Sequence, residues 1–241
     1  IGVVSQLHVA ILLNDNQDII EILLPCWQIG AIPVLIPSRA TASEIAQFIE
    51  NSHTQLLITQ WDFEDSVREI DVQFYFFEEL SQGLGGCGIP HYSGIKSDED
   101  LCLILFTSGT TGSPKSVQLT QKNLLESASQ WHEQLQFCQD DVYLNFLPIH
   151  HIGGISIFIR SLVYGFKTIQ LNSFDESKIL KSIEEHSVSL ISLVPTMLNR
   201  IIKMDNYNLL KSLRGIILSG GPSSNELINI CIVEELPIYK S

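Results

Sequence analysis

The sequence predicts an α/β fold with largely parallel sheets flanked by helices. Short apolar runs of strand length alternate with amphipathic runs of ten or more residues along most of the chain, a pattern typical of parallel strands joined by helical crossovers. With 241 residues, of which 45% are hydrophobic, the chain can bury a sizeable core. This length suits one large domain better than two small ones.

Up to residue 60 the chain alternates regularly between strands and helices. One helix is expected after Asn14 and Asp15, with its end at Gly30. Another is expected after Thr41, because Glu44 stands at the spacing of a capping box. Strands are expected at 8–13, 32–36 and 55–59.

The segment 61–100 breaks this pattern, since it is rich in Asp and Glu and contains a glycine cluster at 83–88. We expect a surface connection with one weak strand near 72–76. The glycine cluster satisfies the pattern G-x-G-x-x-G, but no strand precedes it and Pro90 opposes a following helix. We therefore interpret it as a flexible loop and not as a dinucleotide site.

From residue 101 onward the alternation of strands and helices resumes. Strands are expected near 101–106, 142–146, 167–171, 189–193 and 214–219. Helices are expected at 120–136, 153–164, 175–186, 196–204 and 223–235.

Composition excludes several classes of function. With 14 Lys and Arg against 27 Asp and Glu, the net charge of -13 predicts no nucleic-acid partner and no attraction to an anionic membrane. No apolar run approaches the roughly 20 residues of a transmembrane helix.

The five cysteines are odd in number and form no close pair, so we expect reduced thiols rather than a disulfide framework or a metal site. Because the chain begins at Ile1 without a signal peptide, we interpret it as a piece of a longer protein that is not secreted.

The strongest chemical signal lies directly after the strand at 101–106. Glycines there allow the backbone to approach an anion, hydroxyls can donate to phosphate oxygens, and a lysine adds charge. The order differs from a Walker A loop, whose two glycines stand five positions apart. A polar surface loop is the ordinary alternative, but so specific a run after an apolar strand favours a polyphosphate site. The run is Thr107, Ser108, Gly109, Thr110, Thr111, Gly112, Ser113, Pro114 and Lys115.

Four segments in order resemble motifs of the adenylate-forming superfamily, which includes acyl-CoA synthetases, luciferases and peptide-synthetase adenylation domains. FTSGTTGSPK (106–115) is similar to its signature loop and LPIHHIGG (147–154) to its acyl-pocket motif. LSGGPSS (218–224) is similar to the adenine-binding turn, and ELPIYKS (235–241) to the strand before the Tyr/Phe-Gly-x-Thr-Glu motif. The resemblance covers essentially the whole chain and implies that 1–241 is part of a large N-terminal AMP-binding domain.

The resemblance implies an acid–thiol ligase that uses ATP, Mg²⁺ and CoA to activate a small-molecule carboxylic acid in two steps. The acid would first form an acyl-adenylate, and CoA would then displace AMP. The segments 147–169, 191–202 and 235–241 most resemble o-succinylbenzoate–CoA ligases of menaquinone and phylloquinone synthesis. Two alternatives stay open: another AMP-forming aryl- or fatty-acyl-CoA synthetase or adenylation domain, and a non-catalytic nucleotide-binding paralogue. The implied location is the cytoplasm, or a plastid in a photosynthetic eukaryote, and the oligomeric state is left open.

By this resemblance, individual residues receive expected roles. Those expected to bind the ATP phosphates are Thr107, Ser108, Gly109, Thr110, Thr111, Gly112 and Lys115. Those expected at the adenine are Ser219, Gly220, Gly221 and Pro222, and those at the acyl substrate are His151, Gly153 and Arg160. Lys115 and His151 are the expected catalytic residues.

The residues themselves support two of these roles. His150 and His151 are adjacent and cannot present the same-face geometry of a metal pair on a helix. The proline before them and Gly153 and Gly154 after them favour a pocket loop, so His151 is interpreted as a pocket residue and His150 as packing or surface. The helix expected at 153–164 is apolar nearly all round, so Arg160 is expected to be buried and to need an anion. That anion is either a second carboxylate on the acyl substrate or an internal acidic residue.

The chain ends at Ser241, just before the position of the superfamily's Thr-Glu motif. The resemblance assigns the glutamate of that motif to magnesium, so no metal ligand is expected within 1–241. The small C-terminal domain with its catalytic lysine also lies outside this sequence. We therefore expect little or no ligase activity from the fragment alone.

Overall fold

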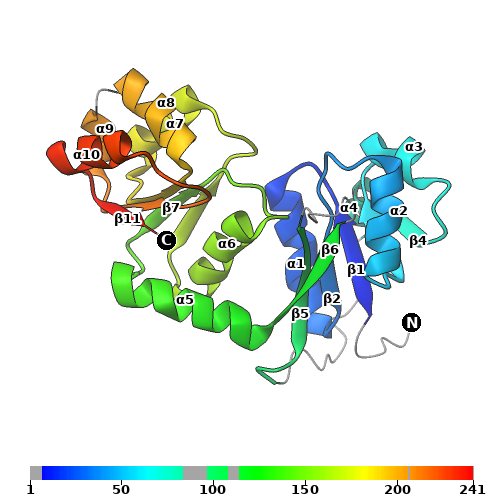
Figure 1. The fold of residues 1–241 in the computed structure, drawn as a ribbon. Coiled ribbons are helices and arrows are strands. Elements are labelled where there is room, and N and C mark those ends of the chain that lie inside the picture. Colours follow the sequence, from blue (N-terminus) through cyan, green and yellow to red (C-terminus); the bar gives the residue numbers. More distant parts are fainter. Residues whose placement is uncertain (1–6, 84–96, 108–113, 206, 241) are drawn as a thin grey trace. The chain divides into compact units, whose positions relative to one another are not determined.

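The computed structural model describes residues 7–83, 97–107, 114–205 and 207–240. The chain divides into two compact units, each with its own sheet (Figure 1). The first unit comprises Ile1–Glu126 with Ile149–Ile152, and the second comprises Ser127–Pro148 with Gly153–Ser241. Both sheets are largely parallel and carry helices, so the predicted α/β fold class is confirmed.

The first unit contains a six-stranded sheet in the order β4-β3-β1-β2-β5-β6. All neighbours are parallel except β5 and β6, which form an antiparallel hairpin. The strand bounds are β1 His8–Leu12, β2 Ile32–Leu35, β3 Leu56–Thr59, β4 Gln73–Phe76, β5 Leu101–Thr107 and β6 Lys115–Thr120. The sequence did not predict β6, because its residues are mostly polar and half-buried or exposed, so it lacks the apolar signal of a core strand.

The helices of the first unit follow the predicted end signals. Helix α1 (Asn16–Ile29) begins at the side-chain cap of Asp15 and ends at Gly30, whose φ of 74° suits glycine. Helix α2 (Ala42–Asn51) begins with the predicted capping box between Thr41 and Glu44. The 3-10 helix η1 (Trp61–Phe63) and the short helices α3 (Glu64–Val67) and α4 (Phe77–Gly83) complete this part.

The expectation that 61–100 is a surface connection with a single strand is wrong in part. Besides β4, this segment contributes α3, whose Val67 is fully buried in the core under α2. The sequence did not predict α3 because most of its residues are acidic or polar, and only a few apolar residues form the buried face of the segment. Residues 84–88 of the glycine cluster lie outside the described residues, so their interpretation as a loop stays a prediction.

The second unit contains a parallel five-stranded sheet in the order β11-β10-β9-β7-β8. The strands are β7 Val142–Asn145, β8 Lys167–Gln170, β9 Leu190–Leu193, β10 Gly215–Leu218 and β11 Ile238–Lys240. The helices are α5 Gln121–Leu135, which begins in the first unit, α6 Ile152–Tyr164, α7 Glu176–His186, α8 Pro195–Asp205, α9 Asn208–Ser212 and α10 Asn225–Val233. The predicted elements agree to within about three residues, apart from α9, which is too short for a periodic signal.

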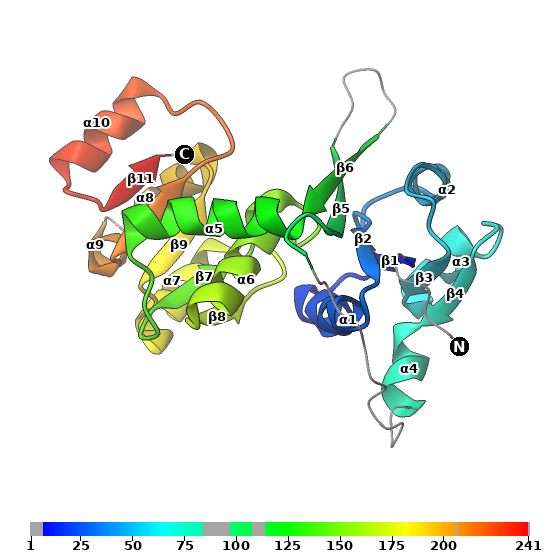
Figure 2. The same ribbon diagram turned by 90° about the horizontal axis from the view of Figure 1, so that it is seen from below.

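Helices cover both faces of the second sheet. Apolar side chains of α5 and α6 pack on Tyr143, Leu190 and Ile217, and Figure 2 shows these two helices across that face. Residues of α7 to α10 pack on the opposite face, against Leu144 and Ile191. The strand order changes direction between β7 and β9, and ligands of such sheets bind beyond the carboxyl ends of the strands at that point.

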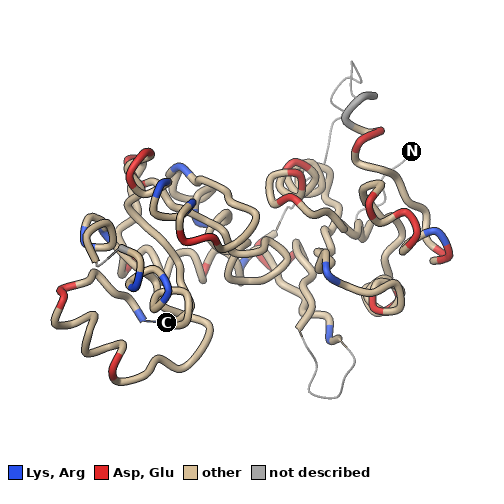
Figure 3. The backbone as a smooth tube through the Cα atoms, turned by 90° about the horizontal axis from the view of Figure 1, so that it is seen from above, with Lys and Arg blue, Asp and Glu red and all other residues tan. Residues whose placement is uncertain are grey.

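Charge and cysteines follow the composition. Figure 3 shows acidic positions on both units, interspersed with fewer basic ones. Among the described residues, Cys26, Cys102, Cys138 and Cys231 are not joined in disulfides, and their reduced state stays a prediction. The helices in the described ranges are too short or too polar for any of them to traverse a bilayer.

Candidate functional site

The predicted phosphate loop connects β5 to β6 in the first unit. Thr107 is the last residue of β5 and Lys115 the first of β6, and the two are directly paired across the antiparallel ladder. Paired residues project from the same face of a sheet, and both are exposed. The hydroxyl and the ammonium therefore stand together at the base of the loop. The predicted residues Ser108, Gly109, Thr110, Thr111 and Gly112 lie outside the described residues.

The base of this loop is firmly anchored. Phe106 is buried, and its ring centroid lies 4.3 Å from that of Phe48 on α2. At the other end of the loop, the Asn51 side-chain amide donates a 3.4 Å hydrogen bond to the Pro114 carbonyl. Because both ends of the loop are attached to α2, Thr107 and Lys115 are held at a fixed position in the sheet.

The predicted adenine turn follows β10 in the second unit, at the carboxyl edge of the sheet. The Ser219 amide donates to the Leu193 carbonyl at 3.0 Å and so ties the turn to β9. Gly220 has a φ of 81°, and a Cβ there would lie 2.8 Å from a Val194 methyl, so only glycine fits well. A Cβ on Gly221 would meet no described atom within 4 Å, which leaves open space beside the backbone. Such a flat, uncovered backbone suits a planar ring, and Pro222 is likewise exposed.

The acyl-pocket motif at 147–154 begins and ends on the second unit, where Asn145 holds it. The Asn145 amide is fully buried, donates to the Gly154 carbonyl at 3.2 Å and accepts from the Leu147 amide at 3.0 Å. A Cβ on Gly154 would lie 2.3 Å from the Pro148 carbonyl oxygen, whereas one on the predicted Gly153 would lie 3.4 Å from a Leu147 methyl. The stricter requirement for glycine therefore falls on Gly154, which is not among the predicted site residues, and neither is Asn145.

The two histidines of the motif belong to the first unit. The preceding Ile149 amide donates to the Asn16 side chain at 3.1 Å, at the start of α1. The rings of His150 and His151 lie 4.4 Å apart. Burial, followed by the neighbouring His151 and Arg39, lowers the pKa of His150 to about 4. Burial also lowers the pKa of His151. His151 is the more exposed of the two residues, and His150 is half-buried.

Both imidazoles are therefore neutral near pH 7, and each ring can donate one hydrogen bond and accept another. Arg39, whose charge acts on His150, lies in the loop after β2. Sequence reasoning missed this residue because a lone arginine in a polar loop carries no signal of its neighbours.

Arg160 lies on α6 and is only 5% exposed. Its guanidinium carbon stands 5.1 Å from the centre of the Trp131 ring, and its buried Nε has no hydrogen-bond partner among the described residues. Burial lowers the pKa of Arg160, while the Tyr143 hydroxyl opposes this effect. No Asp or Glu of the described residues forms an ion pair with Arg160. The internal acidic partner, one of the two expected anions, is therefore not found in the described part of the chain.

The expectation that α6 is buried nearly all round is wrong in part. Ile152, Leu162 and Val163 are each more than 40% exposed, so one side of the helix lies open. Arg160 nevertheless projects from the buried side, which is the feature that matters for its chemistry.

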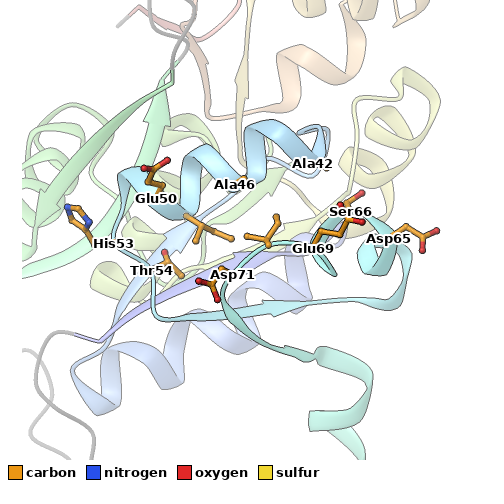
Figure 4. Close-up of a pocket in the computed structure, with 11 residues that line it drawn as sticks. Ala42, Ala46, Glu50, His53, Thr54, Asp65, Ser66, Glu69 and Asp71 are labelled. Carbon is orange, nitrogen blue, oxygen red and sulfur yellow. The ribbon is translucent and has the colours of Figure 1, made fainter.

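Two grooves lie away from these residues. Figure 4 shows one in the first unit, about 740 Å³ in volume, between α2 and the segment that contains α3. Glu50, Asp65, Glu69 and Asp71 make it acidic, but no set of three or more His, Cys, Asp and Glu suited to a metal occurs in the described residues. The other groove, about 510 Å³, lies beside Tyr207 and α10 in the second unit. None of the predicted site residues that the structure describes lines either groove.

Glycine-rich segments at the carboxyl ends of strands, one with paired hydroxyl and ammonium groups and one with an open flat turn, are typical of nucleotide-binding α/β proteins. Residues 1–232 match the model of the family described as AMP-binding enzyme. The chain belongs to this AMP-binding enzyme family.

Its relatives point in the same direction. A 2-succinylbenzoate–CoA ligase of Bacillus cytotoxicus is 31% identical over 97% of this chain and 47% of the relative. A ligase of the same name from Oceanobacillus iheyensis is 30% identical over 97% of this chain and 48% of its own. The chain thus spans about half the length of these curated relatives.

Among solved structures, the o-succinylbenzoate CoA synthetase of Bacillus subtilis in complex with its acyl-adenylate intermediate matches with a TM-score of 0.90. The identity is 30% over 98% of this chain and 48% of that one. The same enzyme with ATP and magnesium matches with a TM-score of 0.88 at 30% identity, over 98% and 49% of the two chains. A Mycobacterium tuberculosis fatty acyl CoA synthetase, at 23% identity and a TM-score of 0.86 over 98% and 49%, shares the fold.

Proposed function

We propose that the protein containing this chain is an AMP-forming acid–CoA ligase that activates o-succinylbenzoate in menaquinone synthesis. The carboxylate attacks the α-phosphate of ATP and pyrophosphate leaves. The CoA thiol then attacks the acyl carbon of the adenylate, AMP leaves, and a thioester results. Identity of about 30% over nearly the whole chain to ligases of this name supports the reaction.

The choice of o-succinylbenzoate as the substrate is supported by one observation: Arg160 is buried and has no acidic partner in the described residues. A guanidinium stays charged at all physiological pH values, and a charge removed from water needs a counter-ion. An acid with two carboxylates supplies one group for activation and a second for Arg160. A monocarboxylic acid would leave the guanidinium unpaired, so this site favours a dicarboxylic acid such as o-succinylbenzoate.

The remaining predicted residues receive roles in this reaction. Thr107 and Lys115, with the loop from Ser108 to Gly112, bind the β- and γ-phosphates and stabilise the leaving pyrophosphate. The turn from Ser219 to Pro222 accepts the adenine. Neutral His151, with Gly153, borders the acyl group and can donate a hydrogen bond to a carboxylate oxygen. The protein's contribution is therefore positioning and electrostatic stabilisation, without a covalent intermediate on a side chain.

Magnesium accompanies ATP in the Bacillus subtilis relative. The described residues of this chain offer no group of three carboxylate, histidine or thiol ligands for a metal ion, so we assign no step to it. We keep the cytoplasm as the proposed location. The bacterial relatives give no support to the plastid alternative.

The test is ATP–pyrophosphate exchange by the full-length protein with o-succinylbenzoate, benzoate or a medium-chain fatty acid. The proposal predicts exchange that depends on o-succinylbenzoate. Exchange with one of the other acids alone would keep the adenylation reaction and overturn the substrate. A folded protein that binds ATP and exchanges with none of the acids would favour the non-catalytic alternative.

A further inference from the structure

A layer of buried polar groups lies between the second sheet and the helices α5 and α6. Tyr143 on β7 is fully buried, and Ser192 on β9 and Arg160 on α6 are each 5% exposed. The Tyr143 and Ser192 hydroxyl oxygens are 2.7 Å apart. The guanidinium of Arg160 lies over the Trp131 ring of α5. Arg160 thus lies against an aromatic face and interacts with the hydroxyl of Tyr143.

Hydrogen-bond chemistry fixes the direction of this chain of groups. The Tyr143 hydroxyl and the Arg160 guanidinium act on each other, since each is a cause of the other's pKa shift. A guanidinium carries only donors, so the tyrosine can interact with it only through its oxygen, and the hydroxyl hydrogen is directed to the Ser192 oxygen at 2.7 Å. Ser192 therefore fixes the rotation of the Tyr143 hydroxyl, and Tyr143 fixes the guanidinium.

Another arginine of the second unit, Arg214, has a structural role and differs from Arg160 in its partner. Arg214 donates two hydrogen bonds to the carboxylate of Asp141, at 2.9 and 2.6 Å, and this pair neutralises it. Arg160 instead has partners that orient it and leave its positive charge uncompensated in the described residues. Neutral hydroxyls in place of a carboxylate keep the charge available to an incoming anion.

We propose that Tyr143, supported by Ser192, is a positioning residue that holds Arg160 ready for the second carboxylate of the acyl substrate and thereby sets the preference for dicarboxylic acids. This inference rests on the proposed function. It adds that the preference depends on a hydroxyl that touches the arginine, and not on Arg160 alone.

The test is Tyr143→Phe in the full-length protein, with KM and kcat measured for o-succinylbenzoate and for benzoylpropionate, the same acid without its ring carboxylate. Phenylalanine keeps the ring in the core and removes only the hydroxyl. Loss of a polar contact with a charged group corresponds to about a tenfold increase of KM for o-succinylbenzoate. We expect kcat, and the KM for benzoylpropionate, to change less than about twofold.

The matched control is Tyr164→Phe, because Tyr164 also lies in the α5 and α6 region, where it stacks on His132 at 4.1 Å. This variant is expected to leave both KM values unchanged. If Tyr143→Phe does not fold, Ser192→Ala takes its place and should raise KM for o-succinylbenzoate alone, by about threefold. Its control is Ser182→Ala, since the Ser182 hydroxyl bonds to the Lys178 carbonyl within α7.

Arg160→Ala separates this inference from the proposed function. If Arg160→Ala raises KM equally for both acids, the proposed contact with the second carboxylate fails. If it raises KM only for o-succinylbenzoate while Tyr143→Phe leaves the ratio of the two KM values unchanged, the contact stands and the role of Tyr143 is overturned. A selective rise in both variants supports both proposals.

Discussion

Asp141 and Arg214 form a bidentate ion pair at the amino ends of the strands of the second sheet, with N–O distances of 2.9 and 2.6 Å. Asp141 precedes β7, Arg214 precedes β10, and Ser189, which also donates to Asp141, precedes β9. One carboxylate therefore joins three strands. This carboxylate lies at the amino ends of the strands. The adenine turn and the start of the acyl-pocket motif lie at the opposite, carboxyl ends.

Asp141→Asn should destabilise the fold and spare the site. Burial raises the pKa of Asp141, but hydrogen bonds from Arg214, the Cys138 amide and Ser189 outweigh it and lower the pKa below its ordinary value. Asp141 is 2% exposed, and loss of its charge leaves the guanidinium partly unpaired. We expect the free energy of unfolding to fall by about 2–4 kcal/mol in urea denaturation.

The control is Glu176→Gln, since Glu176 pairs with an exposed Arg200, and such surface pairs contribute about 0–1 kcal/mol. Equal losses for the two variants would contradict the structural role of Asp141. The KM for ATP should stay unchanged in both.

Gly154→Ala should disrupt the acyl-pocket motif. The new methyl would lie 2.3 Å from the Pro148 carbonyl oxygen, so the backbone has to move and the hydrogen bond from Asn145 is lost. Gly153→Ala places its methyl 3.4 Å from a flexible leucine side chain and should fold normally. Thermal unfolding should show a clear decrease in melting temperature for the first variant alone. A tolerated Gly154→Ala would overturn this description of the loop.

Lys115→Ala should impair the first half-reaction and leave stability unchanged, because Lys115 is exposed at the base of the phosphate loop. Removal of a charge that stabilises the leaving pyrophosphate should lower the rate of ATP–pyrophosphate exchange by at least roughly tenfold. Lys122→Ala is the matched control, since Lys122 is half-exposed and forms a surface ion pair with Glu99. A similar rate in the two variants would remove Lys115 from the phosphate site.

His150 should make the fold sensitive to mild acid. Its folded pKa of about 4 lies below the ordinary 6.5, so between these values the unfolded chain binds a proton that the folded chain does not. The contribution of His150 is therefore present above pH 6.5 and decreases as the pH falls toward 4. His150→Gln should flatten the pH dependence of unfolding in this window. An unchanged slope would show that the environment of His150 does not keep it neutral.

Local signals predicted most of the fold. The Thr41–Glu44 capping box, the αL end at Gly30 and the apolar strands around Leu57 and Ile104 are encoded within a few residues. By contrast, β6 is a strand because it pairs with β5, and its polar sequence does not predict this pairing. The division into two units also depends on which distant segments pack together, and the sequence does not show this.

The site residues also fall into those that local motifs predict and those that depend on contacts formed in the fold. The loop after Thr107 and the turn at Gly220 are contiguous motifs that can be recognised in the sequence. Arg39 and Tyr143 act on residues distant from them along the chain. Asn145 acts on Leu147 and Gly154 nearby, but a single asparagine at the end of a strand does not indicate these hydrogen bonds. The burial of Arg160 was predicted from the apolar helix around it, but its lack of an acidic partner in the described residues emerges only from the packing of α5, α6 and the sheet.

The most direct test is product analysis of the full-length protein incubated with ATP, CoA and o-succinylbenzoate. The account predicts that AMP and the o-succinylbenzoyl-CoA thioester accumulate in equal amounts, and that omission of CoA leaves acyl-adenylate on the protein. Formation of ADP in place of AMP, or absence of the thioester from a folded protein that binds ATP, would contradict it.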